Sequence, residues 1–276
     1  MIVAGPPVPN AAPIGVFDSG IGGLTVMHAL MRRLPAEHLV YFGDTARVPY
    51  GPKSPETVRR FARENVSLLL ERGVKMVVVA CNTVTAHALA ELRQTFAIPI
   101  VGVIGPGARG AVRATRSGRV GVIGTQGTIA SDAYGRQLRA IRPGLEVVSR
   151  ACPLLVPLAE EGLLEHPATR LLAAEYLAPF RSDGVDALIL GCTHYPLFKP
   201  LITDLLGPGT ALIDSAEETA REVAEVLAER ALAADPGTPG TRRFLVSDLP
   251  AQFLRVGQVF LGEALREVEV VRSGEA

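Results

Sequence analysis

Two cysteines end short apolar runs of the chain, and polar residues follow each of them directly. Cys81 ends "KMVVVAC" before "NT", and Cys192 ends "ALILGC" before "TH". A cysteine can act as a nucleophile, or it can move protons as a general acid and base. A single buried cysteine most often serves only for packing. Two at matching positions, each beside polar residues, favour a chemical role for the pair.

Two facing thiols suit a proton shuttle. If a substrate C–H bond lies between them, one thiolate removes the proton and the opposite thiol delivers another to the other face, which inverts the carbon centre. Holding an ordinary cysteine ionised at pH 7 costs roughly 2 kcal/mol, because its pKa is about 8.5. We expect His194 to pair with a thiolate at Cys192, and Asp18 to accept the Cys81 proton or stabilise its thiol form.

A Cys/His hydrolase or acyltransferase is the first alternative. Such an enzyme needs one cysteine, one base and an oxyanion hole, and Cys192 with His194 would supply the first two. Cys81 would then have no role. A non-catalytic binding module is the second alternative, because two facing halves with one cysteine each also describe binding proteins that close about a hinge.

Apolar runs rich in Val and Ile alternate with helix-like segments, so the sequence predicts the α/β class. Runs that are apolar on both faces are typical of parallel strands covered by helices on each side. The predicted strands begin near residues 14, 39, 75, 98, 119, 145, 187 and 210. In open α/β sheets the site lies outside the carboxyl ends of the strands, which is where both cysteines fall.

The strand ends also show a weak internal repeat. "IGVFDSG" resembles "VGVIGTQG", and "VVVACNT" resembles "LILGCTH" at nearly the same offset along the chain. We therefore expect two related α/β halves, each presenting a cysteine at the end of a strand.

Helix and loop signals mark the rest of the chain. Ser54 with Pro55 predicts a helix start, and Gly73 can end that helix. Ser215 with Glu218 has the spacing of a capping box at the start of another helix. The run "DPGTPGT" at 235–241 predicts a linker or exposed loop.

Composition excludes several classes of partner. The 28 basic residues balance 28 acidic ones, so no excess positive charge exists to hold nucleic acid or an anionic membrane surface. The expected partner is therefore a small molecule or another protein. We expect no signal peptide and no membrane span, hence a cytoplasmic protein. Three cysteines are too few and odd in number for a disulfide framework. None belongs to a C-x-x-C pair, which argues against a structural zinc site. The oligomeric state stays open, with a homodimer among the options.

Other residues have simpler interpretations. Asp18 and Ser19 could cap a helix that starts near Gly22. Asp44 could be a turn residue, and Cys152 is expected to be a small buried side chain. The "GIGG" run misses the phosphate-binding patterns. The histidines to which we assign no function are His28, His38, His87 and His166.

Six motifs in order closely resemble those of the cofactor-independent bacterial glutamate racemases. They are "GVFDSGIGGLTV" at 15–26, "YFGDTARVPYG" at 41–51, "VVACNTVTA" at 78–86, "VGVIGTQGTIAS" at 120–131, "CPLLVPLAEEG" at 152–162 and "LGCTHYPL" at 190–197. The two cysteine motifs together are the most specific. The resemblance is loose only in the N-terminal tail and after about residue 235.

This resemblance implies roles for individual residues. Cys81 and Cys192 resemble the two catalytic acid/base cysteines, with Asp18, His194 and Glu160 as their assistants, and Glu161 is the alternative to Glu160. The residues expected to hold the amino acid are Asp18, Ser19, Pro49, Tyr50, Gly51, Asn82, Thr83, Thr125, Thr193 and His194. Racemisation of aspartate is the nearest alternative activity, because the related aspartate racemases share two cysteines and a similar fold.

The resemblance also implies the architecture and the biological use. Two flavodoxin-like parallel-sheet domains are expected to face each other in a pseudo-twofold arrangement. The first would comprise 14–105 with 216–271 and the second 106–215, leaving 1–13 and 272–276 as tails. The family is an isomerase family that uses no cofactor, pyridoxal phosphate included, and no metal. The implied product, D-glutamate, supplies peptidoglycan synthesis for the cell wall and cell shape.

Overall fold

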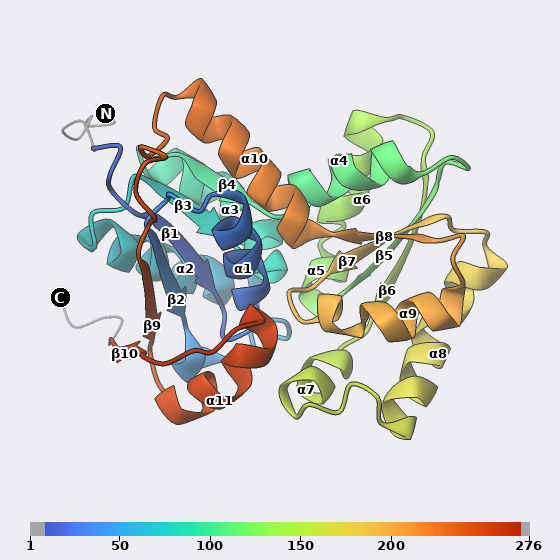
Figure 1. The fold of residues 1–276 in the computed structure, drawn as a ribbon. Coiled ribbons are helices and arrows are strands. Elements are labelled where there is room, and N and C mark those ends of the chain that lie inside the picture. The colour runs from blue at the N-terminus through green and yellow to red at the C-terminus, as the bar shows by residue number, and fades with distance from the viewer. Residues whose placement is uncertain (1–8, 272–276) are drawn as a thin grey trace.

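The computed structural model describes residues 9–271 and contains two fully parallel sheets (Figure 1). The larger sheet has the order β10-β9-β2-β1-β3-β4 and consists of β1 (Ile14–Asp18), β2 (Leu39–Gly43), β3 (Met76–Val79), β4 (Ile100–Gly102), β9 (Arg242–Val246) and β10 (Glu269–Val270). The smaller sheet has the order β6-β5-β7-β8 and consists of β5 (Arg119–Gly124), β6 (Glu146–Ala151), β7 (Ala187–Gly191) and β8 (Ala211–Asp214). The α/β class and the eight predicted strands are confirmed, and β9 and β10 are additional.

The two sheets repeat one strand order. β1 pairs with β2 and β3 in the larger sheet, just as β5 pairs with β6 and β7 in the smaller one. The strands with similar sequences, β1 with β5 and β3 with β7, therefore occupy equivalent positions. Cys81 and Cys192 follow the equivalent strands β3 and β7, which agrees with the repeat expected from the sequence.

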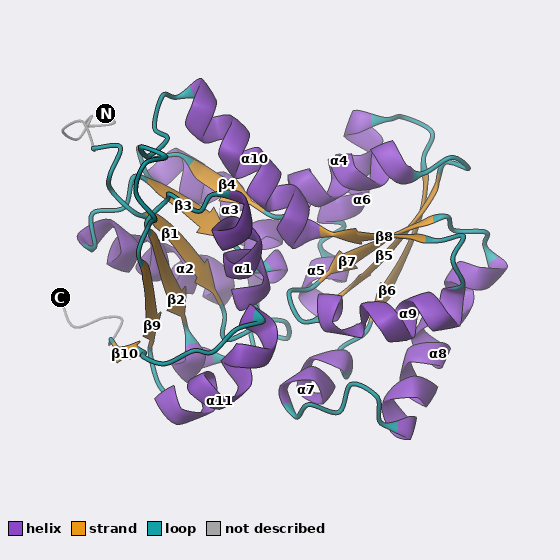
Figure 2. Cartoon of the chain, viewed as in Figure 1, coloured by secondary structure: helices purple, strands orange, loops and turns teal. Residues whose placement is uncertain are grey.

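Helices cover both faces of each sheet (Figure 2). Around the larger sheet lie α1 (Leu24–Arg33), α2 (Pro55–Glu71), α3 (Asn82–Thr95), α10 (Ser215–Glu229) and α11 (Pro250–Leu261). Around the smaller sheet lie α4 (Ile104–Ala114), α5 (Gln126–Ala130), α6 (Ala133–Ile141), α7 (Leu155–Glu160), α8 (Pro167–Ser182) and α9 (Lys199–Leu206). Two short 3-10 turns, η1 (Thr45–Arg47) and η2 (Tyr195–Phe198), follow β2 and β7.

Side chains along the strands alternate between the two faces, as the pleat requires. In β1, Val16 packs with α1, α10 and α11, whereas Phe17 packs with α2 and α3. The cluster that contains Val16 continues across to α8 and α9 on the smaller sheet. One apolar core therefore joins the two halves of the molecule.

The predicted start of α2 is confirmed, whereas that of α10 is wrong by one residue. Ser54 Oγ accepts a hydrogen bond from the Thr57 N–H at 3.3 Å, and Gly73 has a left-handed φ of 71° just after the helix. At α10 the cap is Asp214, whose Oδ1 accepts from the Ala216 N–H at 2.9 Å. Asp214 is still extended at the end of β8, so the chain turns into the helix there and Ser215 is its first residue.

Both ends of the described chain belong to the larger sheet. The exposed loop at 235–241 joins α10 to β9, as predicted. Residues 1–8 and 272–276 of the expected tails lie outside the described residues. Residues 9–13 of the N-terminal tail are held against the larger sheet. The Lys75 N–H donates to the Pro13 carbonyl at 2.9 Å, and the buried ammonium group of Lys75 donates to the Asn10 carbonyl.

Candidate active site

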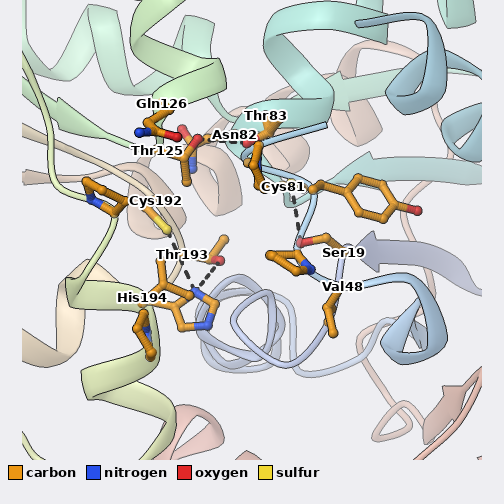
Figure 3. A pocket seen from close by; sticks show the side chains of 18 of the residues that line it. Ser19, Val48, Cys81, Asn82, Thr83, Thr125, Gln126, Cys192, Thr193 and His194 are labelled. Atoms are coloured by element: carbon orange, nitrogen blue, oxygen red, sulfur yellow. Dashed lines mark hydrogen bonds between the residues drawn. The ribbon is translucent and has the colours of Figure 1, made fainter. Parts of the chain in front are cut away.

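A cavity of about 350 Å³ lies at the carboxyl ends of β1, β3, β5 and β7, between the two halves (Figure 3). The predicted site residues that line it are Ser19, Pro49, Tyr50, Gly51, Cys81, Asn82, Thr83, Thr125, Glu160, Cys192, Thr193 and His194. Asp18 alone of the predicted residues does not line the cavity, and it is buried directly behind Ser19.

Cys81 lies between the end of β3 and the first turn of α3. Its Sγ is 3.7 Å from Ser19 Oγ, and the residue is only 6% exposed. Burial, with the nearby carboxyl group of Asp18, raises the pKa of the Cys81 thiol to about 12. The raised pKa keeps Cys81 in its thiol form at neutral pH.

Asp18 is a buried carboxyl group beside this cysteine. Its Oδ2 accepts a hydrogen bond from the Gly20 N–H at 3.0 Å, whereas Oδ1 is buried without a hydrogen-bond partner within residues 9–271. Burial raises the pKa of Asp18, and the opposing charge of His194 lowers it less. The helix-capping interpretation is wrong, because α1 starts at Leu24 with no side-chain cap.

Cys192, His194 and Glu160 form a connected series. His194 Nδ1 lies 3.7 Å from Cys192 Sγ, and Nε2 lies 2.9 Å from Glu160 Oε1. Burial alone would lower the pKa of His194, but its hydrogen bonds with Cys192 and Glu160 outweigh burial and raise that pKa to about 10. The imidazole can therefore hold or return a proton beside Cys192, and Glu160 is the glutamate in "AEEG" that contacts it.

The two thiols reach the cavity from different sheets and from opposite sides of it (Figure 3). Their surroundings differ, because Cys81 has Ser19 and Asp18 beside it whereas Cys192 has the imidazole of His194. Two acid/base groups placed in this way can remove a proton from one face of a bound carbon and add one to the other.

Asp44 holds the loop that carries Pro49, Tyr50 and Gly51 through side-chain hydrogen bonds. This fully buried carboxylate accepts from Arg47 Nε at 2.6 Å, from Ser247 Oγ at 3.0 Å and from the Tyr50 hydroxyl. The peptide bond between Val48 and Pro49 is cis. Asp44 is therefore more than a turn residue, because it connects the loop to the end of β9.

Hydrogen bonds also join the two halves along one wall of the cavity. Thr83 Oγ1 lies 2.9 Å from Thr125 Oγ1, and the Gly127 N–H donates to the Gly51 carbonyl at 3.0 Å. His87, for which we predicted no function, contacts the Gly127 carbonyl through Nε2 at 3.0 Å. These short polar contacts next to Thr83 and Gly51 therefore link the two halves at the edge of the cavity.

Several cavity residues were not predicted, and they are mostly apolar. They are Gly20, Val48, Pro52, Gln126, Pro153, Val156 and Pro157. Some signal was available, because Gln126 follows Thr125 and the last three lie in the "CPLLVPLAEEG" motif. Cys152 from the same motif is fully buried outside the cavity wall, which supports its interpretation as a packing residue.

Residues 9–271 contain no cluster of His, Cys, Asp and Glu suited to a metal ion. Within the same residues, no helix has the length and apolar character needed to cross a membrane.

Comparison with known proteins gives one consistent family. The sequence profile of the Asp/Glu/Hydantoin racemase family matches residues 14–223. A glutamate racemase from Geobacter metallireducens is 56% identical over 92% of this chain and 94% of its own. The crystal structure of a glutamate racemase isoform from Bacillus anthracis superposes with a TM-score of 0.91 at 41% identity, covering 95% of this chain and 98% of that one. The structure of a glutamate racemase from Francisella tularensis in complex with D-glutamate has a TM-score of 0.90 at 39% identity, covering 97% and 100% of the two chains. The chain therefore belongs to the glutamate racemases within the Asp/Glu/hydantoin racemase family.

Proposed function

We propose that the chain interconverts L-glutamate and D-glutamate by moving the Cα proton between Cys81 and Cys192. The observation that carries this proposal is the approach of the two thiols to one cavity from opposite sides. The glutamate racemase from Francisella tularensis binds D-glutamate, and this chain superposes on it over nearly its whole length.

The proposed reaction balances without an oxidant or a cofactor. One cysteine, as a thiolate, takes the Cα proton and becomes a thiol, and the electron pair stays on the substrate as a carbanion delocalised into its carboxylate. The other cysteine, as a thiol, then delivers its proton to the opposite face and becomes a thiolate. His194 with Glu160 assists Cys192, and Asp18 with Ser19 assists Cys81.

The substrate would be held by neutral hydrogen-bond donors and backbone N–H groups. No Lys or Arg within residues 9–271 lines the cavity, so the two carboxylates of glutamate need other hydrogen-bond partners. Asn82, Thr83 and Thr193 have suitable side chains, and α3 directs its first N–H groups toward the Cys81 side. Pro49, Tyr50, Gly51 and Thr125 complete the binding wall.

We further propose that the D-glutamate formed is used for peptidoglycan synthesis. The two halves are proposed as domains, with 14–105 and 216–271 in the first and 106–215 in the second. The repeated strand order and the return of β9 and β10 to the larger sheet support this division. A homodimer remains an expectation that sedimentation equilibrium can test.

Incubation with L-glutamate in deuterated water, without added cofactor, tests the proposed activity. We expect D-glutamate to form with deuterium at Cα. Cys81→Ser and Cys192→Ser should each abolish racemisation, whereas Cys152→Ser, a buried cysteine outside the cavity wall, should retain it. Full turnover in either of the first two variants would overturn the two-cysteine mechanism.

The same preparation separates the alternatives. Racemisation of L-aspartate but not of L-glutamate would identify the nearest alternative substrate. An acyl adduct on Cys192, with indifference to Cys81→Ser, would indicate a hydrolase or acyltransferase. Binding of glutamate in calorimetry without any proton exchange at Cα would indicate a non-catalytic amino-acid-binding module.

A further inference from the structure

Tyr134, on α6, contacts the segments that carry both thiols. The residue is 2% exposed, and its hydroxyl donates to Asn82 Oδ1 at 2.7 Å, next to Cys81 in the chain. Its ring lies against Gly191, which precedes Cys192, since a Cβ placed on Gly191 would be 3.0 Å from Tyr134 Cε2. Tyr134 does not line the cavity itself. It therefore acts on the site only through its neighbours.

We infer that Tyr134 is a positioning residue that fixes the Asn82 amide with its NH2 group toward the cavity, where that group donates to a carboxylate of the substrate. This inference rests on the proposed function. It assigns to α6 a part in substrate binding that no motif in the sequence indicated.

The hydrogen-bond inventory at Asn82 supports this orientation. An asparagine amide has an acceptor side and a donor side, and either can face a given neighbour. Tyr134 occupies Oδ1, and Nδ2 has no hydrogen-bond partner among the described residues although Asn82 is 97% covered. Because Asn82 lines the cavity, its two free N–H groups are available to a ligand there.

Ser215 can leave the single phenol proton available to Asn82. Its Oγ lies 3.0 Å from the Tyr134 hydroxyl, and a serine hydroxyl can rotate to donate. If Ser215 donates to the phenol oxygen, the phenol proton is left for Asn82 Oδ1. Burial raises the pKa of Tyr134, so the phenol keeps its proton at neutral pH.

This arrangement makes the Asn82 position a donor rather than an acceptor. A carboxylate accepts hydrogen bonds only, so a fixed NH2 group favours it, whereas a rotated amide would face it with an oxygen. Without the phenol, both orientations of the amide become accessible. The loss should therefore appear in binding rather than in proton transfer.

Tyr134→Phe is the direct test, because it keeps the ring against Gly191 and removes only the hydroxyl. We expect the Kd of D-glutamate, measured by calorimetry, and the KM of L-glutamate each to rise about tenfold, with kcat changed less than about threefold. The matched control is Tyr176→Phe, on α8 and outside the cavity wall, which should leave both constants unchanged.

A double-mutant cycle with Asn82→Ala distinguishes positioning from general stability. If Tyr134 acts through Asn82, Tyr134→Phe should weaken D-glutamate binding in the wild type and have no further effect when Asn82 is already alanine. Equal effects in both backgrounds, or a lowered melting temperature with an unchanged Kd, would overturn the inference.

The proposed function and this inference fail in different ways. If the wild type binds D-glutamate without racemising glutamate, the proposed function falls, and the Kd cycle still decides the role of Tyr134. If the wild type racemises glutamate and Tyr134→Phe matches it in both Kd and KM, only the role of Tyr134 falls. If the wild type neither binds nor racemises glutamate, both fall.

Discussion

His194 and Glu160 share a hydrogen bond of 2.9 Å between Nε2 and Oε1, while Nδ1 of the same imidazole faces Cys192. The carboxylate therefore sets the direction of the ring and favours its protonated form. A proton held there lies next to the sulfur that the proposed reaction uses. The two atoms of this hydrogen bond are a specific target for mutagenesis.

Glu160→Gln should lower kcat at least about tenfold at pH 8, because the amide cannot favour the imidazolium as the carboxylate does. The pKa of His194 should fall, so the alkaline limit of the pH profile of kcat should move to lower pH. Glu161→Gln is the matched control, since that neighbouring glutamate has no contact with His194 in the described structure. Equal losses in the two variants would contradict the assignment of Glu160.

Stability should decrease as the pH rises through the range in which His194 loses its proton. The pKa of His194 is about 10 in the folded protein and 6.5 for the unperturbed side chain. A raised folded-state pKa contributes stability that is fully present below pH 6.5 and is lost progressively toward pH 10. Urea unfolding at pH 6, 7.5 and 9 should show this decline.

His194→Gln is the comparison for this pH effect. The difference in unfolding free energy between the wild type and this variant should shrink as the pH rises. Cys81 adds a loss in the same direction once the thiol of the unfolded chain ionises, from about pH 8.5 upward, so the window from about 6.5 to 8.5 reports mainly on His194. A difference that is constant with pH would contradict the raised pKa.

Asp44→Ala should weaken substrate binding and destabilise the protein. The change removes the acceptor shared by Arg47, Tyr50 and Ser247, and it leaves the half-buried guanidinium of Arg47 with fewer partners. We expect a loss of about 2–4 kcal/mol in unfolding free energy and a higher KM for L-glutamate.

Asp204→Ala provides the surface control for Asp44→Ala. Asp204 pairs with Arg170, and both side chains are more than half exposed, so its loss should cost less than about 1 kcal/mol. Unchanged KM and stability in Asp44→Ala would show that the loop does not depend on this carboxylate.

Lys75→Met should destabilise the protein without changing the activity of the molecules that remain folded. The fully buried ammonium group of Lys75 lies 2.6 Å from Glu37 Oε2 and 2.8 Å from the Leu232 carbonyl, far along the strands from the cavity. Removing one partner of a buried ion pair costs about 3–5 kcal/mol. Adding Glu37→Leu should restore much of that loss, and a double variant that is less stable than Lys75→Met would contradict this account.

The sequence was most informative where local pattern determines structure. Most strands of the two sheets are apolar runs, and a cysteine followed by polar residues marks the ends of β3 and β7. Strand β9 was missed, because "TRRFLVSD" begins with two arginines and lacks such a run. The strand is only partly buried and lies next to the edge strand β10.

The contacts that position the site residues were less accessible from the sequence. Asp44 and Ser247 are separated by 203 positions, and Tyr134 and Asn82 by 52, so only the folded chain brings each pair together. The "GIGG" run has a further role that no motif indicated. A Cβ on Gly22 would lie 2.3 Å from Thr193 Oγ1 and 2.5 Å from the His194 ring, so glycine is needed there for close approach.

The unequal surroundings of the two thiols have a thermodynamic consequence. Ser19 and Asp18 beside Cys81 differ from the imidazole beside Cys192, so kcat and KM need not be equal for the two directions of the proposed reaction. The free energies of two enantiomers in water are nevertheless identical. By the Haldane relation, kcat/KM must therefore be the same for L- and D-glutamate. If the asymmetry of the protein makes kcat higher for one enantiomer, KM for that enantiomer must be higher by the same factor.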